Sequence, residues 1–328
     1  MEQPADFIAI GDTVVDAFIK LGTGHVQESA QGAELCMPYG AKVPFESVTV
    51  VPAVGNSANA AIAASRLGVP TALVSFLGAD DDGEDCLKAL QAEGVGTKFI
   101  NQEAGKSTNY HYVLWYGEDR TILIKHTAFT TALPDIGSPK WIYLSSLGEH
   151  ARELHFDIIE YKKTHPDIKI AFQPGTLQLG MKRDLDEFYK ATDVLCMNKE
   201  EAQELLGTDE YNMKRLLDAL ENLGPKTVII TDGHAGAYMK YENTYFSMPI
   251  YPDTNPPLER TGAGDAFFST FVAYLAKGYD APHAIRRAPI NSMSVVQYIG
   301  AREGLLSEEL IEELLKKAPT EYELRILE

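Results

Sequence analysis

The stretch Glu259-Arg-Thr-Gly-Ala-Gly-Asp-Ala-Phe-Phe-Ser-Thr-Phe-Val-Ala-Tyr-Leu275 carries the clearest chemical pattern of the chain. It follows a proline-rich loop, and its later apolar residues recur at helical spacing, so it predicts a loop that opens a helix. Gly262, Ala263 and Gly264 have almost no side chain. An anion can therefore come close to the backbone N–H groups that the first helical turn leaves free.

Asp265 lies in that first turn, beside the predicted anion site. A carboxylate next to a stored phosphate is repulsive. A base next to a transferring phosphoryl group is useful, because it takes the proton of the attacking hydroxyl. The stretch therefore predicts a phosphotransferase active site with Asp265 as general base. The alternative is an ordinary helix start, with small residues for packing and an acidic first turn that suits the helix dipole.

Composition narrows the class of protein. The chain has 328 residues, of which 45% are hydrophobic and 23% charged, as in globular proteins that bury a full core. A formal net charge of −18 disfavours nucleic acid and anionic membranes as partners. No apolar run is long enough to span a bilayer. The three cysteines lack metal-ligand spacing and indicate free thiols, so we expect a cytoplasmic protein.

Short apolar runs alternate with helical segments, and this order predicts one α/β domain over residues 1–328, with a mostly parallel central sheet and helices on both faces. In such sheets ligands bind outside the carboxyl ends of the strands. Helices are also expected over residues 284–298 and 307–317. The predicted strands are Phe7–Ile10, Thr71–Leu77, Trp141–Ser146, Ile168–Phe172, Val194–Met197 and Thr227–Thr231.

Two segments rich in strand-forming residues stand apart from this alternation. Residues 17–52 show a strand-like pattern, and residues 108–127 contain a hairpin with its turn at Gly117. We predict that the two segments form a small β-sheet beside the main domain. His111 and His126 lie on the hairpin, where they either meet beside a substrate or, the reading that the sequence favours, form a solvated pair.

Two motifs resemble those of a known family. Thr261-Gly-Ala-Gly-Asp-Ala-Phe267 resembles the C-terminal signature of the ribokinase-like (PfkB) carbohydrate kinases, and Val54-Gly-Asn-Ser-Ala-Asn-Ala-Ala61 resembles their N-terminal signature. The resemblance implies a ribokinase-like fold in which the small β-sheet is a lid that also forms a dimer contact. It further implies transfer of the γ-phosphoryl group of ATP, with Mg²⁺, to a hydroxyl of a sugar, sugar phosphate or nucleoside.

The resemblance also assigns roles to single residues, each of which has a plainer alternative as a turn residue or a helix cap. Backbone groups of Gly262, Ala263 and Gly264 would stabilise the transferring phosphoryl group. The remaining assignments are Asp16, Gly55 and Asn59 for the acceptor, Thr231, Gly233 and Gly236 for the nucleotide phosphates, and Asn198 and Glu201 for Mg²⁺, partly through water. Asn56 or Ser57 is the expected cap of the helix that follows Gly55.

The chain departs from the family pattern at three places, one of which is Val54, where the family usually has a first glycine. Glu259-Arg260 replaces an Asp-Thr pair whose Asp often belongs to a monovalent-cation site, so we do not expect strong activation by potassium. Arg260 would instead bring positive charge to the nucleotide phosphates or pair with Glu259. Gln173-Pro-Gly175 replaces the usual Asp and Arg, and the resemblance gives it no role.

The sequence therefore predicts an ATP-dependent kinase for a small sugar-type acceptor, forming a homodimer through the lid. A nucleoside kinase of the same family is the alternative, and a catalytically silent nucleotide- or sugar-binding protein is a remoter one. The lid cations Lys42, Arg120 and Lys125 are too scattered to indicate a phosphorylated acceptor. A dinucleotide-binding dehydrogenase is disfavoured, because Gly262-Ala-Gly-Asp-Ala-Phe267 lacks the third glycine of that fingerprint.

Overall fold

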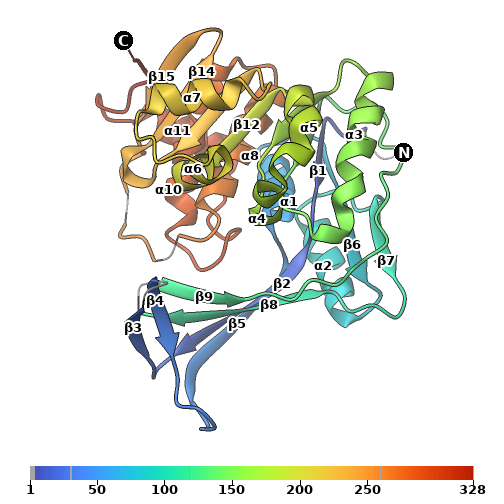
Figure 1. The fold of residues 1–328 in the computed structure, drawn as a ribbon, viewed down its shortest axis with the longest axis vertical. Helices are drawn as coiled ribbons and strands as arrows, with labels where there is room; N and C mark the ends of the chain where they lie inside the picture. Colours follow the sequence, from blue (N-terminus) through green and yellow to red (C-terminus); the bar gives the residue numbers. More distant parts are fainter. Residues whose placement is uncertain (1–3, 30–31, 118, 254, 259, 328) are drawn as a thin grey trace.

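The computed structural model describes residues 4–327 except 30–31, 118, 254 and 259. A large sheet runs through the main body in the strand order β16-β15-β14-β13-β12-β11-β10-β1-β6-β7 (Figure 1). The strands from β13 to β7 pair in parallel, whereas β14, β15 and β16 are antiparallel. Their bounds are β1 (Phe7–Ile10), β6 (Thr71–Gly78), β7 (Ile100–Glu103), β10 (Trp141–Leu144), β11 (Lys169–Phe172), β12 (Val194–Asn198), β13 (Thr227–Thr231), β14 (Ala237–Tyr241), β15 (Thr244–Met248) and β16 (Arg325–Ile326). The predicted mostly parallel sheet is confirmed.

Helices cover both faces of this sheet because its strands are apolar on both sides. In β1, Phe7 and Ala9 belong to one buried cluster, while Ile8 and Ile10 belong to another. The first cluster packs under α1 (Asn56–Arg66), α2 (Asp81–Ala92), α8 (Ala263–Ala276), α9 (Ala281–Ile285), α10 (Ala288–Val295) and α11 (Glu308–Lys316). The second packs under α3 (Arg152–Thr164), α5 (Asp186–Ala191), α6 (Lys199–Leu206) and α7 (Met213–Glu221), and the short α4 (Thr176–Met181) lies near α6.

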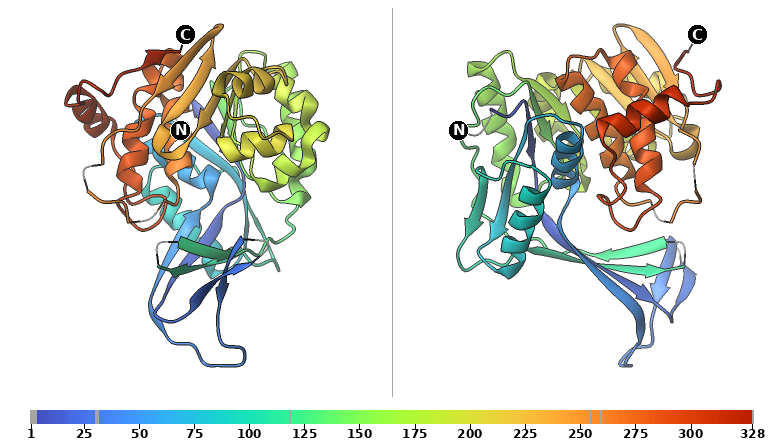
Figure 2. Two further views of the ribbon diagram at one scale, coloured as in Figure 1. Left: turned by 60° about the vertical axis from the view of Figure 1, so that its left-hand side comes forward. Right: turned by 180° about the vertical axis from the view of Figure 1, so that it is seen from behind.

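A small β-sheet projects from the main body (Figures 1 and 2). It consists of β5 (Phe45–Val54), β2 (Val14–Leu21), β8 (Asn109–Tyr116) and β9 (Asp119–Leu123), in that order, with a separate hairpin of β3 (His25–Ser29) and β4 (Gly32–Cys36). Its strands extend slightly beyond the predicted segment 17–52, because β2 begins at Val14 and β5 ends at Val54.

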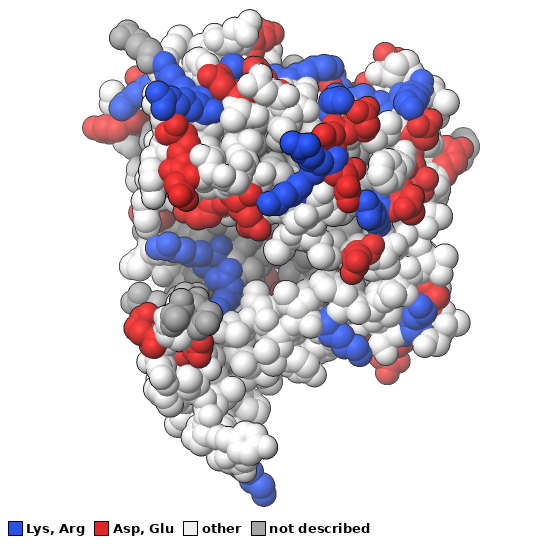
Figure 3. All heavy atoms as spheres, viewed as in Figure 1, with Lys and Arg blue, Asp and Glu red and all other residues white. Residues whose placement is uncertain are grey.

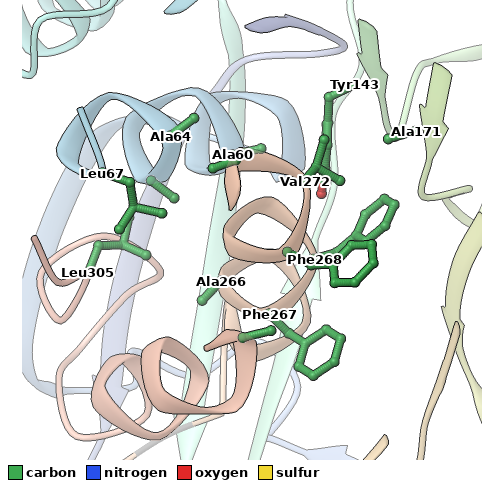
Figure 4. Packing of buried hydrophobic residues seen from close by; sticks show 14 of the residues in the cluster. Ala60, Ala64, Leu67, Tyr143, Ala171, Ala266, Phe267, Phe268, Val272 and Leu305 are labelled. Carbon is green, nitrogen blue, oxygen red and sulfur yellow. The ribbon is translucent and has the colours of Figure 1, made fainter. Parts of the chain in front are cut away.

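Small side chains let α1 and α8 pack closely. Ala60 and Ala64 of α1 lie toward α8, whose Ala266 is also small (Figure 4). Large residues of α8, such as Phe268, instead pack toward the sheet, where Phe268 contacts the ring of Tyr143. This arrangement brings the N-terminal turns of the two helices together at the carboxyl ends of the parallel strands.

The single helix predicted over residues 284–298 is wrong, because the structure divides this segment between α9 and α10. Pro289 has no N–H group, and its ring would clash with the carbonyl of residue 285 in a continuous helix. The predicted C-terminal helix is present as α11, which Ser307 caps. Among the described residues, no helix combines the length and apolar character that a membrane span needs.

Candidate active site

The start of α8 is fixed by a glycine that no other residue can replace without strain. Gly262 has φ of 80° and is the N-cap of α8. A Cβ at this position would lie 2.3 Å from the Cβ of Ala301. Gly264, two residues on, is different, since a Cβ there would meet only Gln173 Nε2 at 3.8 Å. The backbone at Gly264 therefore faces open space that a ligand can enter, as the anion-site prediction requires.

Asp265 is 8% exposed and accepts hydrogen bonds from three side-chain amides. Asn56 Nδ2 donates to Oδ1 at 2.8 Å, and Gln173 Nε2 donates to the same oxygen at 3.1 Å. Asn59 Nδ2 donates to Oδ2 at 2.8 Å. We call Asn56, Asn59 and Gln173 the amide clamp. Oδ1 thus has two partners and Oδ2 one, so Oδ2 keeps the capacity to accept a further hydrogen bond.

The amide clamp acts against the electrostatic effect of burial. Burial raises the pKa of Asp265, and the hydrogen bonds from Asn59, Gln173 and Asn56 partly oppose that rise because they favour the ionised form. A carboxylate whose pKa is raised by burial is a stronger base than an exposed one, which suits it to accept a proton from a hydroxyl.

Gln173 is the member of the clamp that the sequence analysis did not identify. It follows β11 directly, at the carboxyl end of the sheet, and its Oε1 accepts a short hydrogen bond from the hydroxyl of Tyr143. Its place after a parallel strand was the available signal. Asn59 was expected to contact the acceptor, but its Nδ2 is directed to Asp265 and only its Oδ1 lacks a partner among the described residues.

Gly55, rather than Asn56 or Ser57, caps α1, so the expected cap is wrong. Gly55 has φ of 113°, and a Cβ there would lie 2.6 Å from the carbonyl oxygen of Asp12. Asn56 is the first residue of α1 and points its amide to Asp265 instead of capping the helix. Gly55 therefore keeps the loop after β1 in contact with the start of α1.

The three residues expected near the nucleotide phosphates lie together in one pocket of about 210 Å³. Thr231 ends β13, and Gly233 and Gly236 flank a short turn with φ of 48° and 91°. Ala263, Gly264 and Phe267 line the same pocket. The remaining lining is largely apolar, from Ile250, Tyr251, Pro257, Pro289, Met293 and Val296. Such a pocket suits a flat aromatic group, with the backbone at Gly264 available for phosphate.

Arg260 also lines this pocket, where its guanidinium donates a hydrogen bond to His234 Nε2 at 3.1 Å. The expectation that Arg260 brings positive charge toward the nucleotide agrees with this position. The alternative pairing with Glu259 concerns a residue that lies outside the described ones.

Asn198 and Glu201 form a reciprocal cap at the start of α6. Asn198 Oδ1 accepts from the backbone N–H of Glu201, and Glu201 Oε2 accepts from that of Asn198, both at 2.8 Å. Burial raises the pKa of Glu201, the Asn198 N–H opposes the rise, and the negative charge of Asp265 adds to it. A cation nearby would offset the repulsion between the carboxylates of Glu201 and Asp265 and would lower the pKa of Glu201. Among the described residues, no group of three His, Cys, Asp or Glu side chains is arranged so that it could hold a metal ion, so phosphate and water would have to supply most ligands.

Asp16 lies on β2, directly opposite His111 of β8. His111 Nδ1 is 3.4 Å from Asp16 Oδ1, and the His111 ring meets that of His126 edge to face at 5.6 Å. His126 Nδ1 is 3.7 Å from Asp12 Oδ2. The favoured solvated pair is therefore wrong for His111, whose side chain is only 15% exposed, and the two histidines meet beside two carboxylates.

The chain is similar to proteins of one known family. Residues 35–308 match the model of the pfkB family carbohydrate kinases. The chain is 28% identical to a Bacillus subtilis ribokinase over 269 residues, 80% of this chain and 87% of the relative. It is 27% identical to an ATP-dependent 6-phosphofructokinase of Thermoanaerobacterium thermosaccharolyticum over 272 residues, 75% of this chain and 80% of the relative.

The fold is also that of a solved member. The structure of an Arabidopsis thaliana ribokinase complexed with ribose and ATP aligns with a TM-score of 0.80 and 20% identity, over 96% of this chain and 99% of that one. The expected ribokinase-like fold is confirmed. The chain belongs to the pfkB family of carbohydrate kinases and is a kinase of the sugar or nucleoside type.

Proposed function

We propose that this protein transfers the γ-phosphoryl group of ATP to a hydroxyl of a free sugar, with Asp265 as the general base. The observation that carries the proposal is the environment of Asp265, a buried carboxylate at the start of α8 whose Oδ2 accepts one hydrogen bond while Oδ1 accepts two. An acceptor hydroxyl bonded to Oδ2 would lie beside the backbone of Gly264. Oδ2 would take its proton as the hydroxyl oxygen attacks phosphorus.

Backbone N–H groups at Ala263 and Gly264 would stabilise the charge on the transferring phosphoryl group. Arg260 would contribute a charge near the nucleotide phosphates, and Figure 3 shows lysine and arginine side chains in the hollow between the small β-sheet and the main body. Thr231, Gly233 and Gly236, which line the same pocket, would also contact the donor. These groups give a chain with a net charge of −18 a local site for an anionic donor.

Glu201, with Asn198, would hold Mg²⁺ through water. The fit rests on the second carboxylate oxygen of Glu201, which the cap leaves available, and on the raised pKa of Glu201 beside Asp265. When bound, Mg²⁺ neutralises negative charge on the phosphates. Asn198 contributes by fixing the Glu201 side chain, since its own Oδ1 is already occupied by the Glu201 N–H.

The small β-sheet would close over the acceptor and exclude water, which competes as a phosphoryl acceptor. Its inner face carries Asp16 and Phe18, the latter with its ring 3.8 Å from the position of a Cβ at Gly300. A nucleoside acceptor would present the same hydroxyls and remains the second candidate. A silent binding protein would not need a buried carboxylate held by three amide side chains.

Phosphorylation should be measured as ADP release with Mg²⁺ across free sugars, nucleosides and sugar phosphates, with Asp265→Asn as the control. We expect turnover of one class and a loss of about 10²–10⁴ in the variant. A loss of less than tenfold would reject Asp265 as general base. ATP binding without turnover on any class would favour the silent binding protein.

We also propose a homodimer through the outer face of the small β-sheet. Val48, Val50, Tyr112 and Leu123 share that face and are 47–52% exposed, and few charges cover the sheet in Figure 3. An apolar face of this kind is typical of an interface. Light scattering after gel filtration should give a dimer for the wild type and a monomer for Val48→Lys. Thr49→Lys, on the opposite face, is the matched control, and a monomeric wild type would contradict the proposal.

A further inference from the structure

Three histidines and two carboxylates converge where the small β-sheet meets the main body. Asp12 follows β1, Asp16 lies on β2 and His111 on β8, His126 follows β9, and His150 lies in the 3-10 turn η1 (Glu149–Ala151) after β10. All three imidazoles are close enough to Asp12 to favour its ionised form, His150 most and His111 least. We call these five residues the histidine cluster.

The histidine cluster contains polar atoms that the protein itself does not satisfy. Asp12 is 6% and Asp16 7% exposed, yet Oδ1 of each accepts no well-aligned hydrogen bond from the described residues. The buried Nε2 atoms of His111 and His150 likewise have no hydrogen-bond partner among the described residues. Proteins seldom leave such atoms unpaired, because each one costs about 1–3 kcal/mol when buried. Several unpaired atoms at one place indicate a site for a polar ligand.

The charge of the cluster restricts what that ligand is. Burial raises the pKa of Asp12, and the imidazoles of His150 and His126, the Gly148 N–H and the His111 imidazole partly oppose the rise. Burial lowers the pKa of His126, which keeps that ring neutral near pH 7. Among the described residues, the groups within ion-pair distance of Asp12 and Asp16 are imidazoles rather than lysines or arginines. A phosphate or carboxylate group would meet like charge here, whereas hydroxyl groups can donate to the carboxylates and exchange hydrogen bonds with the imidazoles.

The cluster is tied to the reactive end of the site through α1. Gly55 holds the start of this helix against the carbonyl of Asp12, and Asn59, one turn later, donates to Asp265. A small acceptor lying across the start of α1 would therefore reach both places, with one hydroxyl at Asp265 and the others at the cluster.

We propose that Asp12, His111, His126 and His150 form, with Asp16, a subsite that selects uncharged acceptors with adjacent hydroxyl groups and rejects phosphorylated or acidic sugars. This inference rests on the proposed phosphoryl transfer for the position of the reacting hydroxyl. The inference adds the class of acceptor and names the histidines that recognise its hydroxyl groups. The 6-phosphofructokinase relative is named for an acceptor of the rejected class, so membership of the family does not decide the point.

The first test compares matched acceptors, namely ribose with ribose 5-phosphate, fructose with fructose 6-phosphate, and glucose with gluconate. We expect kcat/KM for at least one uncharged sugar to exceed that of its charged partner by about a hundredfold or more. Equal or better use of the charged partner would overturn the proposal.

The second test changes the histidines. His111→Phe and His126→Ala should each raise KM for the acceptor by roughly tenfold to a hundredfold, with KM for ATP unchanged. His111→Gln, whose amide lies near the position of Nε2, should restore part of the loss. His283→Gln on α9, an exposed histidine paired with Asp280, is the control. Unchanged acceptor KM in both variants would reject the cluster as a subsite.

A third measurement separates this inference from the proposed function. Calorimetric titration of the same sugars into the wild-type protein without ATP requires no turnover. Binding of uncharged sugars alone supports the subsite, even where no phosphorylation is found and the proposed function fails. Comparable binding of the charged partners, or binding of neither kind at millimolar concentration, overturns the subsite.

Discussion

Two buried carboxylates near the start of α1 are held in opposite ways. Asp265 accepts hydrogen bonds from three amide side chains, which carry no charge and do not titrate. Asp12 accepts one backbone hydrogen bond, from Gly148 at 2.7 Å, and is otherwise surrounded by imidazoles. Burial raises the pKa of both. The difference teaches that the amide clamp fixes one carboxylate for proton transfer, while the histidine cluster leaves the other with an oxygen to offer a ligand.

Removal of each carboxylate should affect different kinetic constants, and this is the largest effect that we expect. Asp265→Asn should lower kcat by about 10²–10⁴, because the proton acceptor is lost. Asp12→Asn should lower kcat by less than about tenfold and mainly raise the acceptor KM, because only a hydrogen bond to substrate weakens. Steady-state kinetics on both variants checks this. Equal losses of kcat would remove the distinction between the two carboxylates.

The amide clamp can be broken without touching Asp265. Gln173→Glu places a second carboxylate beside Asp265, and like charge raises the pKa of the base. The base must be ionised to act, so the acid side of the pH–kcat profile should move to higher pH in this variant, with kcat lowered at acidic pH and recovering as the pH increases. Gln173→Met, which removes one donor without adding charge, should shift the pH–kcat profile less. An unmoved profile in both variants would mean that Gln173 does not act through Asp265.

The smallest effect that we expect is a change in the melting temperature when Asp12 is replaced. Folding raises the pKa of Asp12 above 3.8, so its contribution to stability is full below that value and is lost as the pH rises through the raised pKa. At pH 7 ionised Asp12 therefore destabilises the fold. Asp12→Asn should raise Tm there by about 2 °C, with the gain vanishing toward pH 4.

Asp193 is the matched comparison for that melting experiment. Burial alone would raise its pKa, but hydrogen bonds from Lys162 at 2.5 Å and Lys226 at 2.7 Å, with a further one from the Ile170 N–H, outweigh burial and lower it. Its stabilisation is present above 3.8 and is lost as the pH falls through the lowered pKa. Asp193→Asn should therefore lower Tm at pH 7. If Tm at pH 7 changes in the same direction in both variants, the partners of a buried carboxylate do not decide whether it stabilises or destabilises the fold.

The features that could be predicted from the sequence are those that a single short stretch of residues determines. The strands Phe7–Ile10 and Thr227–Thr231 have the predicted bounds, since short apolar runs between helical segments leave few other assignments. Gly262 and Asp265 were identifiable because the predicted anion site and the proposed base belong to one turn of one helix. The small β-sheet was predicted from its β-branched and aromatic residues. The predicted segment 17–52 left out the first residues of β2 and the last residues of β5.

Contacts between distant segments were not predictable in this way. Asn59 was placed at the correct helix, but its partner depends on how closely α1 and α8 pack through their alanines. Gln173 reaches Asp265 only because β11 ends beside α8. The meeting of His111 with Asp16 requires the register of β2 against β8, which no single stretch encodes.

The division of labour along the chain has a consequence for redesign. Asp265 and the amide clamp come from α8, α1 and the end of β11, all in the main body, whereas the histidine cluster combines Asp12 and His150, which follow β1 and β10 of the main sheet, with Asp16, His111 and His126, which lie on or next to strands of the small β-sheet. A combinatorial library restricted to positions 12, 111, 126 and 150 would therefore leave the proton-transfer machinery intact. Selection from such a library could retarget the enzyme to new acceptors through few simultaneous changes.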